Sequence, residues 1–237
     1  MKTIHTKNAD YQKLMVLKTN RNKRHKYGQF IVEGVRNINE AVRNCWRIDA
    51  FLYPLAAQLS SWASATLDSC PGAERIGLEP ALMAELSGKE DTSELMAVAR
   101  MREDRPESLP LGDRPLLALF DRPSNKGNLG TLIRSCDALG VDALILTGHG
   151  VDLYDPDTIV SSMGSFFNCL LYTSKNCRGD SSSPPRRLHR DVGHVRLIEY
   201  LPKTAVADDA PFHRRHQIMG AMAPSQLVEQ SFPGPRR

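Results

Sequence analysis

The sequence has no pair of closely spaced cysteines. Its five cysteines are odd in number and scattered, and no two of them form a C-x-x-C pair. This pattern argues against a zinc site and a disulfide framework, and it suits a reducing compartment. The four C-terminal histidines (His189, His194, His213 and His216) have no cysteine or carboxylate set beside them, so we expect no metal.

Long apolar runs are also missing. No stretch approaches the roughly 20 apolar residues that a membrane-spanning helix needs. The polar start, MKTIHTKNAD, has no apolar core of a signal peptide. These absences predict a cytoplasmic protein that does not insert into membranes.

Charge is unevenly distributed along the chain. The formal net charge is +4, and residues 1–26 carry eight Lys and Arg against the single acidic residue Asp10. Within the run KTNRNKRHKYG, we expect four side chains to contact the phosphates of a nucleic acid: Arg21, Lys23, Arg24 and Lys26. From charge alone, a solvated basic arm explains the run equally well.

Strand and helix patterns alternate through the first part of the chain. Apolar runs predict strands over 29–34, 48–54, 74–80 and 92–101, and helical spacing predicts helices over 35–45, 55–70 and 80–88. This alternation predicts a compact α/β domain over residues 1–110. The charged, proline-rich stretch 102–115 is typical of a linker.

A second alternation follows at once. LLALF (116–120) predicts a strand buried on both faces of a parallel sheet, and VDALILTG (141–148) predicts the next strand. Between them, a helix closes on Gly140, with one apolar face formed by Leu129, Leu132, Ile133, Cys136 and Leu139. The intervening loop, RPSNKGNLG, therefore lies where open α/β sheets bind ligands. After residue 175 the pattern ends, and only 194–201 predicts a further strand.

The glycine-rich loop has two interpretations. If Asn128 and Gly130 open the helix, their backbone N–H groups face an anion or an oxygen-rich ligand, and Arg134 follows one turn later, pointing away from the apolar face. Alternatively, Asn-Gly pairs make tight turns for steric reasons alone. The loop has no G-K-[ST] and no G-x-G-x-x-G, so it is neither a P-loop nor a dinucleotide-binding turn.

Three segments resemble the SpoU-type (TrmH family) RNA 2′-O-ribose methyltransferases of the SPOUT superfamily. RPSNKGNLGTLIRSCDALG is similar to the family's first motif, N-x-G-x-x-x-R followed by A-x-G, which falls on Asn128, Gly130, Arg134, Ala138 and Gly140. DPDTIVSSMGSFF resembles the segment that follows it. GQFIVEGVRNINEAV has the F-x-x-E-G cadence of the family's substrate-binding domain. The resemblance covers residues 20–168 or so.

The resemblance implies an α/β substrate-binding domain over 1–110 and a knotted SPOUT methyltransferase domain from 111 onward. Family members act as homodimers and transfer a methyl group from S-adenosylmethionine to a ribose 2′-hydroxyl of ribosomal or transfer RNA. The resemblance places Arg134 and Asn128 at the catalytic centre. Because a guanidinium is a poor base, we expect Arg134 to hold the phosphate and ribose in place. The resemblance implies no metal.

The C-terminal part departs from the family. The family's second motif, G-x-E-x-x-G, and its third, S-x-N-V-x-x-A, hold the donor, and neither is present. The methyltransferase domain is therefore incomplete at residue 168, and we expect little or no activity from this chain. Residues 169–237 form a non-matching tail, which we expect to be poorly ordered. It is either a divergent C-terminus or chimeric sequence, since CLLYTS (169–174) is also the translation of a common transposon-end adapter.

The sequence leaves three functional hypotheses. The first is an RNA ribose methyltransferase, and the second is a non-catalytic RNA-binding protein that has lost the chemistry. The third is an unrelated α/β nucleotide-binding protein that uses the GNLG turn. Donor binding separates the first from the second, and RNA binding separates both from the third.

Overall fold

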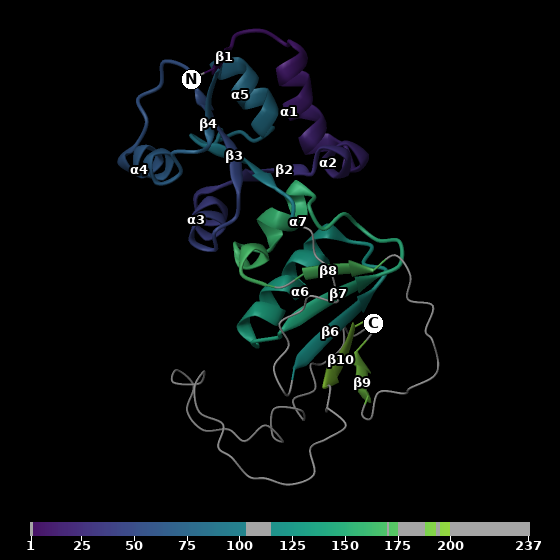
Figure 1. Cartoon of the computed structure of the whole chain (residues 1–237). Helices are drawn as coiled ribbons and strands as arrows, with labels where there is room; N and C mark the ends of the chain where they lie inside the picture. Colours follow the sequence, from purple (N-terminus) through teal and green to yellow (C-terminus); the bar gives the residue numbers. More distant parts are fainter. Residues whose placement is uncertain (1, 103–114, 170, 175–187, 193–194, 200–237) are drawn as a thin grey trace. The chain divides into compact units, whose positions relative to one another are not determined.

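The computed structural model describes residues 2–102, 115–169, 171–174, 188–192 and 195–199 (Figure 1). Helices accompany two five-stranded sheets, each of which mixes parallel and antiparallel pairs. The predicted α/β class is confirmed. The predicted linker lies almost wholly outside the described residues, as does most of the predicted C-terminal tail.

The first sheet has the strand order β1-β4-β3-β5-β2. Its strands are β1 (Lys2–Ile4), β2 (Gln29–Glu33), β3 (Ile48–Pro54), β4 (Glu74–Leu78) and β5 (Met96–Arg100). The strands β1, β4 and β3 are parallel, whereas β5 is antiparallel to both β3 and β2. All four predicted strands of this region are present, and β3 has the predicted bounds.

Helices cover both faces of the first sheet. They are α1 (Ala9–Thr19), α2 (Arg21–Tyr27), α3 (Val35–Arg43), α4 (Ser61–Ser69) and α5 (Pro80–Ser87). Along β2, Ile31 belongs to the core formed with α1 and α5, while Phe30 and Val32 belong to the core formed with α3 and α4. The sheet is therefore buried on both faces because side chains alternate along each strand.

The basic N-terminal segment is folded and packed, so it is not a solvated arm. Asn8 and Asn20 cap α1 and α2, accepting from the backbone N–H of Tyr11 and Lys23. Tyr11, Leu14 and Leu17 on one side of α1 are buried against the sheet. Short polar side chains at these caps satisfy amide groups that the first turn leaves free.

The second sheet has the strand order β8-β7-β6-β10-β9. Its strands are β6 (Leu116–Asp121), β7 (Ala143–Thr147), β8 (Leu171–Ser174), β9 (Leu188–Val192) and β10 (Val195–Glu199). The strands β6, β7 and β8 are parallel, and β10 is antiparallel to β6 and β9. The strand predicted at 194–201 is thus confirmed as β10, and part of the CLLYTS segment forms β8.

Burial of β6 differs from the prediction. Among the described residues only Ala118 of this strand is buried, and its other side chains are partly exposed. An apolar run alone does not tell a strand enclosed on both faces from one that is partly covered.

Three short elements complete the second domain: α6 (Lys126–Ala138), α7 (Pro156–Ser161) and a 3₁₀ turn (Ser165–Phe167). The helix α6 begins two residues earlier than predicted, because the side chain of Asn125 caps it. Leu139 is not part of its apolar face. It is the C-cap residue and is 61% exposed.

Aromatic side chains join the two sheets in one continuous core. Phe30 and Trp46 come from the first domain, and Tyr154, Phe166 and Phe167 from the second. Ring centroids of Phe30 and Tyr154 lie 4.9 Å apart, and those of Trp46 and Phe166 lie 5.4 Å apart. The indole N–H of Trp46 donates to the carbonyl oxygen of Phe167 at 2.9 Å. These phenylalanines are structural, as buried aromatic clusters usually are.

Candidate functional site

The helix α6 carries the two predicted catalytic residues, Asn128 and Arg134, and both side chains are exposed. Within the described residues, the Arg134 guanidinium has no hydrogen bond or ion pair. Its position agrees with the helical count, because Leu129, Ile133 and Cys136 form the buried face of α6. An exposed guanidinium without an internal partner is available to an anionic ligand.

The C-terminal ends of the parallel strands lie beside this helix. Asp121 ends β6, Thr147 ends β7 and Ser174 ends β8, and these three residues are paired in register. The hydroxyl of Thr147 donates to Asp121 Oδ1 at 2.7 Å. The predicted placement of the glycine-rich segment at this edge of the sheet is therefore correct.

The loop from β6 to α6 packs against the loop that follows β7. Arg122 adopts a left-handed backbone conformation with φ of 48°. The amide of Val151 donates to the carbonyl oxygen of Pro123 at 2.7 Å. Residues held in this conformation cost free energy, and such residues cluster at ligand sites.

Gly130 is needed for helix packing. A Cβ atom placed on it would lie 2.4 Å from Ser161 Cβ and 2.8 Å from the backbone carbon of Ser161. Gly130 lies inside α6, so it does not form the tight turn of the steric interpretation; its small size instead lets α6 and α7 meet at this point. The motif glycine lets the helix with Asn128 and Arg134 lie against α7.

Lys126, the first residue of α6, forms two ion pairs. Its Nζ lies 3.1 Å from Asp155 Oδ1 and 3.0 Å from Asp157 Oδ2. The hydrogen bond to Asp157 is the main cause of a raised Lys126 pKa, which burial opposes. This lysine is therefore held by α7 and does not point freely into the site.

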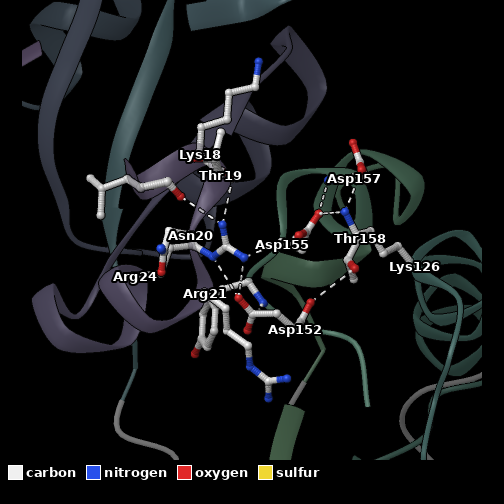
Figure 2. A network of polar contacts seen from close by, with 12 residues as sticks. Lys18, Thr19, Asn20, Arg21, Arg24, Lys126, Asp152, Asp155, Asp157 and Thr158 are labelled. Carbon is white, nitrogen blue, oxygen red and sulfur yellow. Dashed lines mark hydrogen bonds and ion pairs between the residues drawn. The ribbon is translucent and has the colours of Figure 1, made fainter. Parts of the chain in front are cut away.

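Arg24 is buried, unlike the other three residues that were predicted to contact RNA. Its side chain is 2% exposed and pairs with Asp152, whose Oδ2 lies 2.7 Å from Arg24 Nη2 (Figure 2). Its Nη1 donates to the carbonyl oxygens of Leu17 and Lys18. Because these groups enclose the guanidinium, no phosphate reaches it in this structure, and the prediction for Arg24 is corrected.

The other three predicted RNA-binding residues, Arg21, Lys23 and Lys26, are exposed on α2. Arg21 donates to the carbonyl oxygen of Gly150 at 2.8 Å. Lys13, from α1, lies with its Nζ 5.3 Å from the centre of the Tyr27 ring. Elsewhere in the basic segment, lysines are already paired: Lys2 with Asp10, and Lys7 with Glu85. The exposed positive charge is thereby concentrated on α2 and its neighbour Lys13.

Comparison with known proteins places both domains in one family. Residues 8–97 match the SpoU L30e-like domain, and residues 115–179 match the SpoU rRNA methylase family. Over these two segments the chain belongs to the SpoU family. The second match runs past residue 168, where the motif resemblance was expected to end.

Several SpoU relatives resemble this chain. A 23S rRNA (uridine(2479)-2′-O)-methyltransferase of Streptomyces viridochromogenes is 42% identical over 166 residues, which is 70% of this chain and 58% of the relative. The 23S rRNA (guanosine(2553)-2′-O)-methyltransferase RlmP of Bacillus subtilis is 27% identical over 159 residues, covering 67% of this chain and 58% of the relative. The chain thus spans less than two thirds of each of these proteins.

A solved structure supports the same fold. The SpoU methyltransferase AviRb from Streptomyces viridochromogenes, in complex with the cofactor AdoMet, is 40% identical with a TM-score of 0.67, covering 71% of this chain and 64% of AviRb. The family match argues against the third hypothesis, an unrelated α/β nucleotide-binding protein.

The described residues enclose a cavity of about 40 Å³, lined by Trp46, Tyr154, Phe166 and four neighbours, beside the aromatic cluster. That volume suits water-sized groups, whereas small-molecule sites span about 300–1,000 Å³. At the sheet edge, the side chains of Thr147 and Asp121 are hydrogen-bonded to one another.

The described part of the chain contains neither a metal-binding cluster nor a membrane-spanning helix. No group of three His, Cys, Asp or Glu side chains there could hold a metal ion. No helix in these ranges is long and apolar enough to cross a membrane. Among the histidines considered as ligands, His194, His213 and His216 lie outside these ranges.

Sequence reasoning missed the acidic residues that organise the site. Asp155 caps α7 by accepting from the Asp157 amide at 3.0 Å, and it also pairs with Lys126 and Arg24. An aspartate followed by proline signals a helix start, so the cap was visible in the sequence. The ion pairs were not, because Arg24 and Asp155 are 131 positions apart.

Proposed function

We propose that this chain provides the RNA-recognition domain and the ribose-positioning helix of an RNA 2′-O-methyltransferase. S-adenosylmethionine is the methyl donor, and the substrate is a ribose 2′-hydroxyl of ribosomal or transfer RNA. Arg134 carries this proposal, because its exposed guanidinium has no partner among the described residues and it lies on the motif helix α6, which begins after the carboxyl end of β6. The SpoU relatives described above support it.

Arg134 acts by binding and orienting RNA. A guanidinium is a poor base, so we do not assign Arg134 the removal of the proton of the ribose hydroxyl. Two parallel N–H donors on a phosphate would instead fix the direction in which the neighbouring ribose faces. Holding the reacting groups in place supplies a large part of a rate enhancement. Asn128, exposed in the first turn of α6, braces the loop that precedes the helix.

The exposed face of α2 binds the RNA backbone. Arg21, Lys23 and Lys26 contact phosphates, which gives affinity with little dependence on sequence. Arg24 turns inward and fixes the helix that carries them. We further propose that the protein acts as a homodimer in the cytoplasm, as the family resemblance implies.

The test separates RNA binding from donor binding. Binding of a fluorescent ribosomal RNA fragment is measured by anisotropy, and S-adenosylmethionine binding by calorimetry. We expect RNA binding that weakens with salt and weakens further in Arg134→Gln. Micromolar donor binding would mean that residues outside the described ranges complete the donor site, and methyl transfer by the chain is then expected.

If the donor does not bind, the chain recognises RNA without catalysing transfer on its own, as the missing second and third motifs predict. If folded protein binds neither ligand, the proposed function is wrong. The matched control for Arg134→Gln is Arg43→Gln, because Arg43 is also an exposed helical arginine and its partner among the described residues is Glu40 of the same helix.

A further inference from the structure

Arg24 is fixed by groups from both domains. Its Nη2 lies 2.7 Å from Asp152 Oδ2 and 3.3 Å from Asp155 Oδ2, both of which belong to the methylase domain. Its Nη1 donates to carbonyl oxygens at the end of α1, at 3.1 Å and 2.8 Å. Because only 2% of the side chain is exposed, water cannot replace the partners that the guanidinium would lose if it moved. The orientation of α2 and the position of these aspartates are therefore mutually dependent.

Asp155 connects this buried pair to the motif helix (Figure 2). One of its oxygens, Oδ2, faces Arg24, and the other, Oδ1, lies 3.1 Å from Lys126 Nζ. The same Oδ1 accepts from the amide of Asp157 at 3.0 Å. A single carboxylate thus holds the buried arginine of α2, the start of α7 and the first residue of α6.

Lys126 lies two positions before Asn128. A second carboxylate, that of Asp157, also holds its amine at 3.0 Å. The first turn of a helix is the part that frays most readily, because its amides lack partners within the helix. Ion pairs at Lys126 therefore act on the turn that carries the proposed catalytic asparagine.

We propose that Arg24, Asp155 and Lys126 are positioning residues that couple the RNA-binding helix α2 to the first turn of α6. Contact of RNA phosphates with the outer face of α2 restrains Arg24 on its inner face. The restraint passes through Asp155 to Lys126 and orders the Asn128 turn. This inference rests on the proposed function for its RNA input, but the coupling itself exists in the free protein.

The coupling differs measurably from independent structural roles. If the three side chains only stabilise their own surroundings, the effects of removing them add. If they act as one unit, substitution of Arg24 should no longer affect the first turn of α6 once the Asp155 carboxylate has been removed. Asp155→Asn is suited to this test, because asparagine caps helices as well as aspartate does but carries no charge.

The experiment follows amide hydrogen exchange of residues 126–132 by mass spectrometry in the RNA-free chain. Arg24→Gln is expected to speed exchange there by about tenfold, whereas in the Asp155→Asn background it adds less than about twofold. Equal acceleration in both backgrounds would overturn the proposal. Arg43→Gln, which breaks an exposed pair elsewhere, should leave this segment unchanged.

A second variant keeps the test valid if the first variant does not fold. Exchange at the fully buried Phe51 and Leu52 reports whether the first domain is intact. If Arg24→Gln unfolds it, the same cycle is run with Arg24→Lys, which keeps the charge but loses the fork that reaches two carboxylates. The same criterion applies: acceleration at 126–132 that depends on Asp155 supports the coupling, and acceleration independent of it overturns the coupling.

RNA binding is measured separately by anisotropy. In the wild type, bound RNA should slow exchange at residues 126–132, and in Asp155→Asn it should bind without slowing it. RNA that binds the wild type and leaves this segment unchanged would overturn the proposal. Failure of the wild type to bind RNA would instead count against the proposed function, while the result of the RNA-free cycle would stand.

Discussion

Gly130 of α6 and Ser161 of α7 are in direct contact, and no side chain fits between them. A methyl group on Gly130 would lie 2.4 Å from Ser161 Cβ and 2.9 Å from the amide nitrogen of Ser162. Backbone atoms cannot move aside as a flexible side chain can. The glycine of the first motif is therefore required by the packing of α6 on α7.

The substitution Gly130→Ala should destabilise the chain by about 1–3 kcal/mol, the usual cost of overpacking a tight contact. Urea unfolding followed by circular dichroism measures this. The matched control is Gly72→Ala, because a Cβ there meets nothing within 4 Å. Equal stability of the two variants would contradict the close approach of α6 and α7.

Removal of the buried arginine should have a larger effect. Arg24→Ala leaves Asp152, which is 4% exposed, without its main partner, and such losses cost about 3–5 kcal/mol. Lys23→Ala, one position earlier and exposed, should change the free energy of unfolding by less than about 0.5 kcal/mol. Urea unfolding of the two variants side by side tests the inward placement of Arg24. A similar small effect for both would contradict it.

Thiol reactivity should divide the described cysteines into two classes. Burial raises the pKa of Cys136 to about 11 and that of Cys169 to about 12. Cys45 is exposed and Cys70 is partly exposed. At pH 8, iodoacetamide should therefore modify Cys45 and Cys70, and should modify Cys136 and Cys169 only after unfolding. Peptide mapping by mass spectrometry assigns each site, and rapid labelling of Cys136 in folded protein would contradict its burial.

The Lys126 ion pairs predict a pH dependence at high pH. Its pKa is raised above the ordinary value of 10.5, chiefly by the hydrogen bond to Asp157. A raised folded-state pKa means that the stabilisation is fully present below 10.5 and is lost as the pH rises through the higher folded value. The protection of the amides of residues 126–132 against hydrogen exchange, measured relative to the intrinsic rate, should therefore fall above this pH. In Lys126→Gln the decline should be absent, and an identical decline in the variant would contradict the assignment.

Regular features of the fold were predictable from local patterns. The bounds of β3 follow from an apolar run ended by Pro54, and α5 follows from Pro80 at its start and Gly88 after its end. The α/β class and the placement of the motif loop follow from the alternation of elements. These features depend on neighbours in sequence, which a single sequence displays.

The N-terminal helices were missed because their charge obscured a weak apolar pattern. In α1 only Tyr11, Leu14 and Leu17 are buried, spaced three apart among lysines. The N-cap residues Asn8 and Asn20 are typical signals of a helix start, but the interpretation of this segment from its charge did not use them. Basic character is compatible with a helix, an arm or an RNA surface, so composition alone did not separate them.

The structure was needed to tell which of the basic residues are buried and which are exposed. Arg24 and Lys23 are adjacent in the sequence, yet one is buried and the other exposed. What distinguishes them is Asp152, which lies 128 positions away from Arg24. Contacts over such separations arise from the packing of one domain on another, and one sequence does not reveal them.

The most direct test of the account is the salt dependence of RNA binding. The logarithm of the affinity of the wild-type chain for a ribosomal RNA fragment should fall linearly with the logarithm of salt concentration. Each phosphate contact removed in Arg21→Gln, Lys23→Gln and Lys26→Gln should make that slope shallower by roughly 0.7–0.9. Arg24→Lys should leave the slope unchanged, because Arg24 is buried. A slope unaffected by the three exposed cations, or folded protein with no affinity for RNA, would contradict the account.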